Sequence, residues 1–99
     1  MYRIARANAN ADFSLDLRFT DGKEARVDLS ELVASAPIAA PLRDASRFVS
    51  DLRLVEDGDV LRWNEQFELH ADSLRYRAFP DELVRDYGPQ VSTHGRPAA

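Results

Sequence analysis

The residues best suited to chemistry are a histidine between two acids. The sequence has two histidines, and one of them, His70, lies between Glu68 and Asp72. An imidazole beside carboxylates can transfer protons or bind a metal ion. In an extended segment these three side chains would share one face, because the intervening Leu69 and Ala71 point the other way. Three polar groups on one face can equally be solvated. We therefore assign no catalytic, cofactor-binding or metal-binding residue.

The motifs of familiar enzymes are missing from the sequence. There is no cysteine, which removes disulfides, thiolate nucleophiles and cysteine zinc sites. There is also no glycine-rich phosphate loop and no Gly-x-Ser-x-Gly elbow. We therefore predict a non-catalytic protein-interaction module, such as an accessory or antitoxin-like partner of another small protein. Two alternatives stay open: a small enzyme that uses His70 with Glu68 and Asp72, and a nucleic-acid-associated accessory protein.

Composition indicates one soluble domain. The chain has 99 residues, of which 44% are hydrophobic and 30% charged. No apolar run approaches the roughly 18 residues that a membrane span needs, and no signal-peptide pattern opens the chain. We expect a cytoplasmic protein without a membrane partner. The net charge of −4 argues against direct nucleic-acid binding, because phosphate contacts need a basic surface.

The sequence predicts a β-hairpin at residues 13–29, FSLDLRFTDGKEARVDL. Apolar and polar residues alternate on both sides of Asp21-Gly22, which predicts two half-buried strands. A three-residue loop ending at Gly22 pairs the apolar faces and also sets Asp16 opposite Arg26 on the outer face. Gly22 then takes a left-handed conformation, which glycine adopts without steric cost.

A second hairpin is expected around Asp57-Gly58. A two-residue turn of type I′ sets Leu54 opposite Leu61 and Leu52 opposite Trp63, so the turn residues and the hydrophobic register agree. The two apolar pairs then share one face.

The outer face of this second hairpin carries a like-charge pair. Arg53 lies opposite Arg62, which is unfavourable unless an acid such as Asp51 or Asp59 lies nearby. The pair is either a solvated face or a small recognition patch.

The remaining segments complete an α+β fold. The expected elements are a strand at residues 2–7, a helix capped by Ser30 and ending near Ala36, a crossing loop at 37–48 anchored by Phe48, an extended segment at 67–69, helical turns after Asp72, and a helix from Pro80 to Gly88 whose apolar side is Leu83, Val84 and Tyr87. We predict an antiparallel sheet of about five strands from two β-hairpins, with short helices on one face. Residues 1–88 form the domain, and residues 89–99 form a disordered tail.

The order of these features resembles a small bacterial family catalogued as domain of unknown function 2442 (DUF2442), over about residues 2–79. The resemblance is carried by FSLDLRFTDGKEARVDLSEL, PLRDASRFVSDLRLV and VLRWNEQFELHADSLRY. The chain departs from the family after Trp63, where Asn64 to Gln66 replace the usual Pro-Asn-Gly. The resemblance implies an α+β domain without an established activity, sometimes encoded beside small toxin-like proteins and sometimes joined to a helix-turn-helix, which this sequence does not include. It supplies no catalytic or cofactor residues.

The open edge of such a sheet predicts how a partner binds. An edge strand carries unpaired backbone donors and acceptors, so residues 2–7 or 65–69 are expected to pair with another small protein or a second copy, most simply as a homodimer. The candidate partner-binding residues are Ile4, Arg53, Arg62, Trp63 and Phe67. No cofactor is expected.

The first hairpin yields a stability prediction. Gly22→Val should lower the free energy of unfolding by about 1–3 kcal/mol, because a branched residue is strained in the left-handed conformation. Thermal or denaturant unfolding measures this effect, and an unchanged melting curve would contradict the loop assignment.

Overall fold

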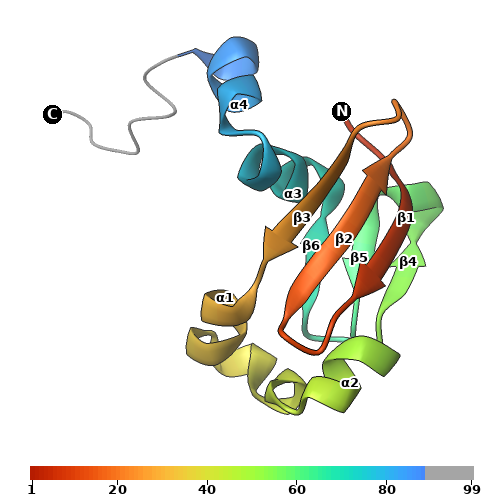
Figure 1. The fold of residues 1–99 in the computed structure, drawn as a ribbon, viewed down its shortest axis with the longest axis vertical. Coiled ribbons are helices and arrows are strands. Elements are labelled where there is room, and N and C mark those ends of the chain that lie inside the picture. The colour runs from red at the N-terminus through yellow and green to blue at the C-terminus, as the bar shows by residue number, and fades with distance from the viewer. Residues whose placement is uncertain (89–99) are drawn as a thin grey trace, which may run out of the picture.

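The computed structural model describes residues 1–88 as two antiparallel sheets with helices at both ends (Figure 1). The first sheet, in the order β1-β2-β3, contains β1 (Ile4–Ala9), β2 (Ser14–Phe19) and β3 (Glu24–Asp28), and the second, in the order β4-β5-β6, contains β4 (Arg53–Val55), β5 (Val60–Arg62) and β6 (Glu68–His70). The helices are α1 (Ser30–Ser35), α2 (Ala45–Ser50), α3 (Ala71–Ala78) and α4 (Pro80–Tyr87), with 3-10 turns η1 (Pro37–Arg43) and η2 (Glu56–Gly58).

This architecture confirms the predicted α+β class and corrects its details. The described residues form six strands in two sheets, whereas one sheet of about five strands was expected. The helices lie beyond the two ends of the sheets, α1 and α2 at one end and α3 and α4 at the other, and not on one face (Figure 1). None of the helices within residues 1–88 is long and apolar enough to cross a membrane. The expected tail, residues 89–99, lies outside the described residues.

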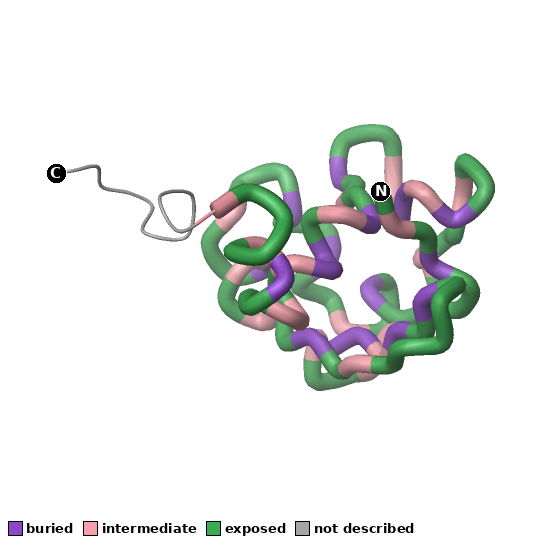
Figure 2. Tube along the Cα trace, turned by 90° about the horizontal axis from the view of Figure 1, so that it is seen from above, coloured by how far each residue is buried: buried purple, intermediate pink, exposed green. Residues whose placement is uncertain are grey.

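One hydrophobic core joins the two sheets. The chain encircles it when seen from above (Figure 2). Leu15, Leu17 and Phe19 alternate along β2 and are at most 3% exposed, so the period-2 pattern of that strand turns its apolar side inward. The second sheet contributes Leu61, which is fully buried, to the same cluster. The opposite side of the first sheet carries the exposed side chains of Arg18, Glu24 and Arg26.

The predicted register of the first hairpin is confirmed. Leu15 lies opposite Val27 on the inner side, and Asp16 lies opposite Arg26 on the outer side. Gly22 has a φ of 93°, the left-handed conformation that the three-residue loop requires.

The register of the second hairpin is also confirmed over three residue pairs. Leu54 lies opposite Leu61. Asp57 and Gly58 have φ values of 57° and 88°, and the Asp59 N–H donates to the Glu56 carbonyl at 3.1 Å, which matches a type I′ turn.

Two details of this hairpin differ from the prediction. The expected pair of Leu52 and Trp63 is not part of the ladder, which begins at Arg53. The Trp63 N–H donates instead to the Phe67 carbonyl at 3.1 Å, on the side of β6. Leu54, expected on the buried face, is 38% exposed. Leu52 and Trp63 lie just outside their strands, and Leu54 lies on β4, the edge strand of the second sheet.

The helix after the first hairpin begins one residue from where it was expected. Ser30 is the first residue of α1 and not its cap, and its N–H donates to the Asp28 carboxylate at 2.9 Å. The expected crossing loop also contains helix α2, whose capping residue Asp44 accepts the Ser46 N–H at 3.0 Å. A helix of six residues is too short for its hydrophobic period to stand out from the sequence.

The two C-terminal helices form where proline and glycine predicted. Pro80 occupies the first turn of α4, and Gly88 ends it with a φ of 95°. Asp72 does not cap α3 but lies in its first turn, where its carboxylate accepts the backbone N–H of Tyr2 at 2.6 Å. The expected apolar side of α4 is largely solvent-facing, since Tyr87 is 56% exposed.

A buried arginine attaches these helices to the first hairpin. Arg75 in α3 is 2% exposed, and its Nε donates to Glu82 of α4 at 2.6 Å. Its Nη1 and Nη2 donate to the two carboxylate oxygens of Asp21 at 3.1 and 2.8 Å. Glu82 also accepts from Lys23 Nζ at 2.8 Å. The cluster of Arg75, Glu82, Asp21 and Lys23 therefore links the hairpin tip to both helices.

Aromatic rings enclose the same guanidinium. The Arg75 Cζ lies 4.3 Å from the ring centroid of Tyr2, 4.8 Å from that of Phe19 and 5.1 Å from that of Phe79. Each ring face attracts a cation, and a desolvated cation gains most. The rings therefore compensate part of the cost of burying this charge.

A pair of glycine substitutions tests the backbone packing. A Cβ at Gly58 would overlap the backbone of Ile4, whereas a Cβ at Gly22 would meet nothing within 4 Å. Both glycines have positive φ, so alanine costs about 1–2 kcal/mol of left-handed strain at either position. Gly58→Ala should lose about 1 kcal/mol or more beyond Gly22→Ala, because overpacking adds to strain. Equal losses in urea unfolding would contradict this packing.

The Arg75 cluster predicts acid sensitivity. The hydrogen bonds from Arg75, and then from Lys23, lower the pKa of Glu82 from 4.5 to about 2. A depressed pKa adds stability above pH 4.5 that is lost as the pH falls toward 2. The difference in unfolding free energy between wild type and Glu82→Gln should therefore be largest above pH 4.5 and shrink toward pH 2. Urea titrations across this range measure it, and a constant difference would exclude this linkage.

Candidate functional site

Three of the predicted partner-binding residues belong to the core. Ile4, Trp63 and Phe67 are 2%, 5% and 3% exposed. The Trp63 ring stacks on that of Phe48 with 5.5 Å between centroids, and its Nε1 donates to the Phe48 carbonyl at 2.9 Å. In this conformation their side chains are not accessible to a partner.

The other two predicted residues, Arg53 and Arg62, are accessible but engaged. They lie opposite each other, as the register predicted. Arg62 donates to Glu68 at 2.9 Å and lies 3.7 Å from Glu56, so these two glutamates, and neither of the expected aspartates, compensate the pair. Arg53 donates to two main-chain carbonyls at 3.1 and 3.2 Å. The two glutamates offset the positive charge of the pair, and the carbonyls occupy donors of Arg53.

The histidine and its two acids are not brought together. The Nε2 of His70 lies 4.0 Å from Glu68, and the His70 side chain is 65% exposed. Asp72 instead holds the N–H of Tyr2. Within residues 1–88 no group of three or more histidine, aspartate and glutamate side chains is arranged to hold a metal ion.

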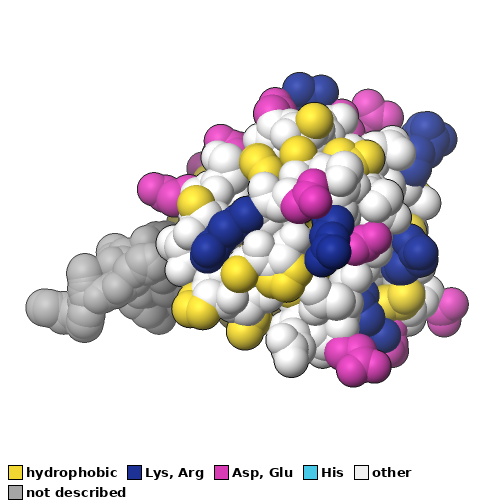
Figure 3. All heavy atoms as spheres, turned by 90° about the horizontal axis from the view of Figure 1, so that it is seen from below, with side chains coloured by type: hydrophobic (Ala, Val, Ile, Leu, Met, Phe, Trp, Pro, Cys, Tyr) yellow, Lys and Arg dark blue, Asp and Glu magenta, His cyan; other side chains and the backbone are white. Residues whose placement is uncertain are grey.

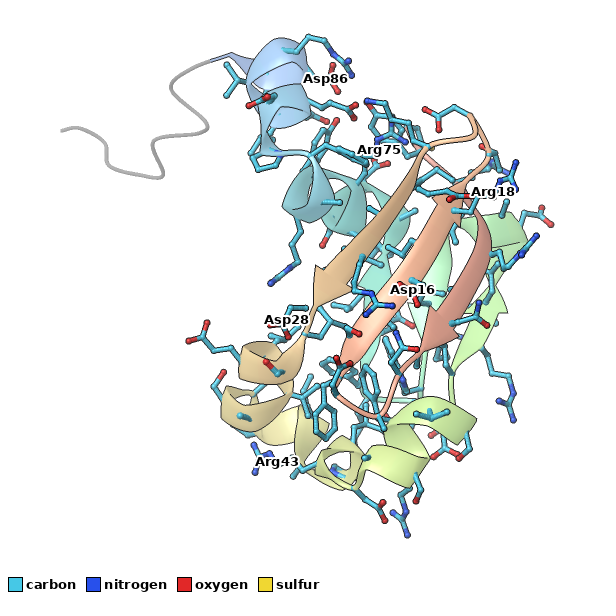
Figure 4. The ribbon with its side chains drawn as sticks, in the orientation of Figure 1. Asp16, Arg18, Asp28, Arg43, Arg75 and Asp86 are labelled. Carbon is cyan, nitrogen blue, oxygen red and sulfur yellow. The ribbon has the colours of Figure 1, made fainter. Side chains whose placement is uncertain are left out.

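The open side of the first sheet is the surface on which charged side chains of three strands converge. We call this surface the outer face, and it consists of Arg6, Asn8, Asp16, Arg18, Glu24 and Arg26. Five of these residues, together with Leu17 and Ala25, line a shallow depression of about 410 Å³. Asp16 and Arg18 project from β2 on this side of the ribbon (Figure 4). The strands thus hold six polar side chains in two rows.

The first row is internally neutralised. Asn8 lies opposite Asp16, and Asp16 opposite Arg26. Arg26 forms two hydrogen bonds to Asp16, from Nε at 2.8 Å and from Nη2 at 3.1 Å. Asn10 adds a third at 3.1 Å. The hydrogen bonds from Arg26, and then from Asn10, hold the pKa of Asp16 below its usual range.

The second row is not neutralised. Arg6 lies opposite Arg18, and Arg18 opposite Glu24. The only ion pair in this row joins Arg18 to Glu24 at 3.8 Å, between side chains that are 50% and 67% exposed. The row contains two arginines and one acid, so it carries a net positive charge. Its guanidinium groups can bind an anion, and neither row places a nucleophile beside a base.

The sequence predicted the residue pairs on one side of this surface, between β2 and β3, but not those between β1 and β2. The pairs across β2 and β3 followed from the hairpin, but the pairing of Arg6 with Arg18 did not. The register between β1 and β2 shifts between Ile4 and Arg6, and such an irregularity has no clear sequence signal.

Comparisons with known proteins identify a family and a similar fold. A family model described as "Protein of unknown function (DUF2442)" matches residues 4–80. The structure is similar to the crystal structure of NE0471 from Nitrosomonas europaea, a candidate DNA-binding protein, with a TM-score of 0.69 and 17% identity. The likeness covers 93% of this chain and 65% of that one, so the chain spans less than two thirds of its neighbour. No curated protein sequence matches.

Proposed function

Because the chain belongs to the DUF2442 family, whose function is unknown, we propose from its own surface that it is a non-catalytic protein-interaction module. A partner protein docks on the outer face. The observation that carries this proposal is a solvent-facing row that contains two arginines, Arg6 and Arg18, and one acid, Glu24, which pairs with Arg18. Charged pairs of this kind guide recognition and set its specificity.

The apolar side chains at the end formed by α1, η1 and α2 make a less continuous surface. Ile38 and Val49 are 52% and 42% exposed. Seen from below, the hydrophobic groups lie in small clusters separated by charged side chains (Figure 3). Scattered apolar groups are normal on protein surfaces and do not define a docking site.

The predicted strand addition stays a prediction, and the fold restricts where it can happen. At the start of β1 the backbone of Ile4 lies against Gly58 of the turn η2. At the other candidate edge, β6 is only three residues long and is followed directly by α3. A partner on the outer face needs neither edge, so docking on this face and homodimer formation are separate questions.

Nucleic-acid binding is the competing class. NE0471, whose fold is similar, is described as a candidate DNA-binding protein, and this description favours the class. The net charge of −4 and the acids on the outer face disfavour it here. Tight binding of a short DNA duplex at Arg6 and Arg18 would support this alternative.

The proposal is tested by blocking the outer face without changing its charge. Asn8→Tyr places a neutral bulky side chain on the depression, and Gln66→Tyr makes the same kind of change in the exposed turn before β6. Both variants should keep the wild-type melting temperature. Proteins captured from cells by wild type and Gln66→Tyr, and identified by mass spectrometry, should be lost with Asn8→Tyr by about tenfold or more. A capture profile that Asn8→Tyr leaves unchanged would refute the proposal.

A further inference from the structure

The guanidinium groups of Arg6 and Arg18 differ from the other arginines of the two sheets. Arg26 forms two hydrogen bonds to Asp16, and Arg62 bonds to Glu68. Arg6, by contrast, makes no ion pair within 4.0 Å in the part of the chain that the structure describes, and Arg18 has only the distant Glu24. Their donors are therefore available to a ligand.

The two arginines are also placed as a pair. They are register partners on β1 and β2, and neighbouring strands lie roughly 4.8 Å apart. Like charges directly opposite each other destabilise a sheet, so this arrangement costs stability in the free protein. A single anion between the two guanidinium groups would remove that repulsion and accept hydrogen bonds from both.

We propose that Arg6 and Arg18 bind a side-chain carboxylate from an acidic segment of the partner protein. This inference rests on the proposed function and names the chemistry that the outer face recognises. The planar guanidinium fork matches a carboxylate with two parallel hydrogen bonds. Asn8 lines the same depression and has an amide that can donate a further bond.

The surroundings favour a carboxylate on a polypeptide over a phosphate backbone. Phosphodiester binding needs several neutralising cations in a line, whereas this row offers only Arg6 and Arg18, and Arg18 already has a long ion pair with Glu24. Asp16 and Glu24 line the same depression and would repel further phosphates. A peptide can place one acid on Arg6 and Arg18 and a neutral or basic residue beside Glu24.

The probe is a short capped peptide of alternating glutamate and serine, titrated into 15N-labelled protein and followed by NMR. The matched control peptide has glutamine in place of glutamate. We expect saturable shifts of the amide and Nε signals of Arg6 and Arg18 with the glutamate peptide and none with the control. Arg6→Gln or Arg18→Gln should weaken binding about tenfold, since each substitution removes charge-assisted hydrogen bonds to the carboxylate. Arg47→Gln, an exposed arginine on α2, should leave it unchanged.

Three outcomes would overturn the inference. The first is an absence of shifts at Arg6 and Arg18. The second is an equal response to inorganic phosphate, which would mean unspecific anion binding. The third is tighter binding of a short DNA duplex at the same residues, which would make this a nucleic-acid surface.

The tests of the docking face and of the carboxylate can fail separately. If Asn8→Tyr releases the captured partner while Arg6→Gln and Arg18→Gln retain it, the outer face binds the partner but not through a carboxylate. If Asn8→Tyr retains the partner, the proposed function fails even where the peptide binds.

Discussion

The arrangement of this protein depends on the buried guanidinium of Arg75. Its donors reach Asp21 in the first turn and Glu82 in the last helix, residues that are distant in sequence. Burying a lone cation would be prohibitive, but here two carboxylates and three aromatic rings surround it. Loss of either acid would leave charge uncompensated in a buried site. The cluster therefore fixes the hairpin tip relative to α3 and α4.

That attachment explains why the outer face stays open. The C-terminal helices lie at the end of the first sheet, where Arg75 bonds to Asp21 and Glu82 to Lys23 at the tip of the hairpin (Figure 1). The other helices lie at the opposite end, where Phe48 of α2 is fully buried. The first sheet thus buries its inner side in the core and leaves its charged side to solvent.

The alternation of apolar and polar residues, together with the turn residues, predicted the two β-hairpins. Alternation and turn chemistry around Gly22 and Gly58 specified both hairpin registers, because period and turn type constrain one another. The division into two sheets depends on contacts between segments far apart in the sequence. The role of Arg75 was invisible for the same reason: nothing near it in the chain distinguishes it from a solvated arginine, and its partner Asp21 lies 54 positions away.

The same distinction applies to the candidate site. The bond between Asp16 and Arg26 obeys the rule that opposite charges pair across strands, and the hairpin alone predicted it. Arg6 opposite Arg18 breaks that rule, although an acid at position 6 would pair with Arg18 and stabilise the sheet. Natural sequences are mostly consistent with their folds, and local conflicts without internal compensation concentrate where a protein binds or reacts. The conflict on the outer face is therefore best explained by an anion that arrives from outside the chain.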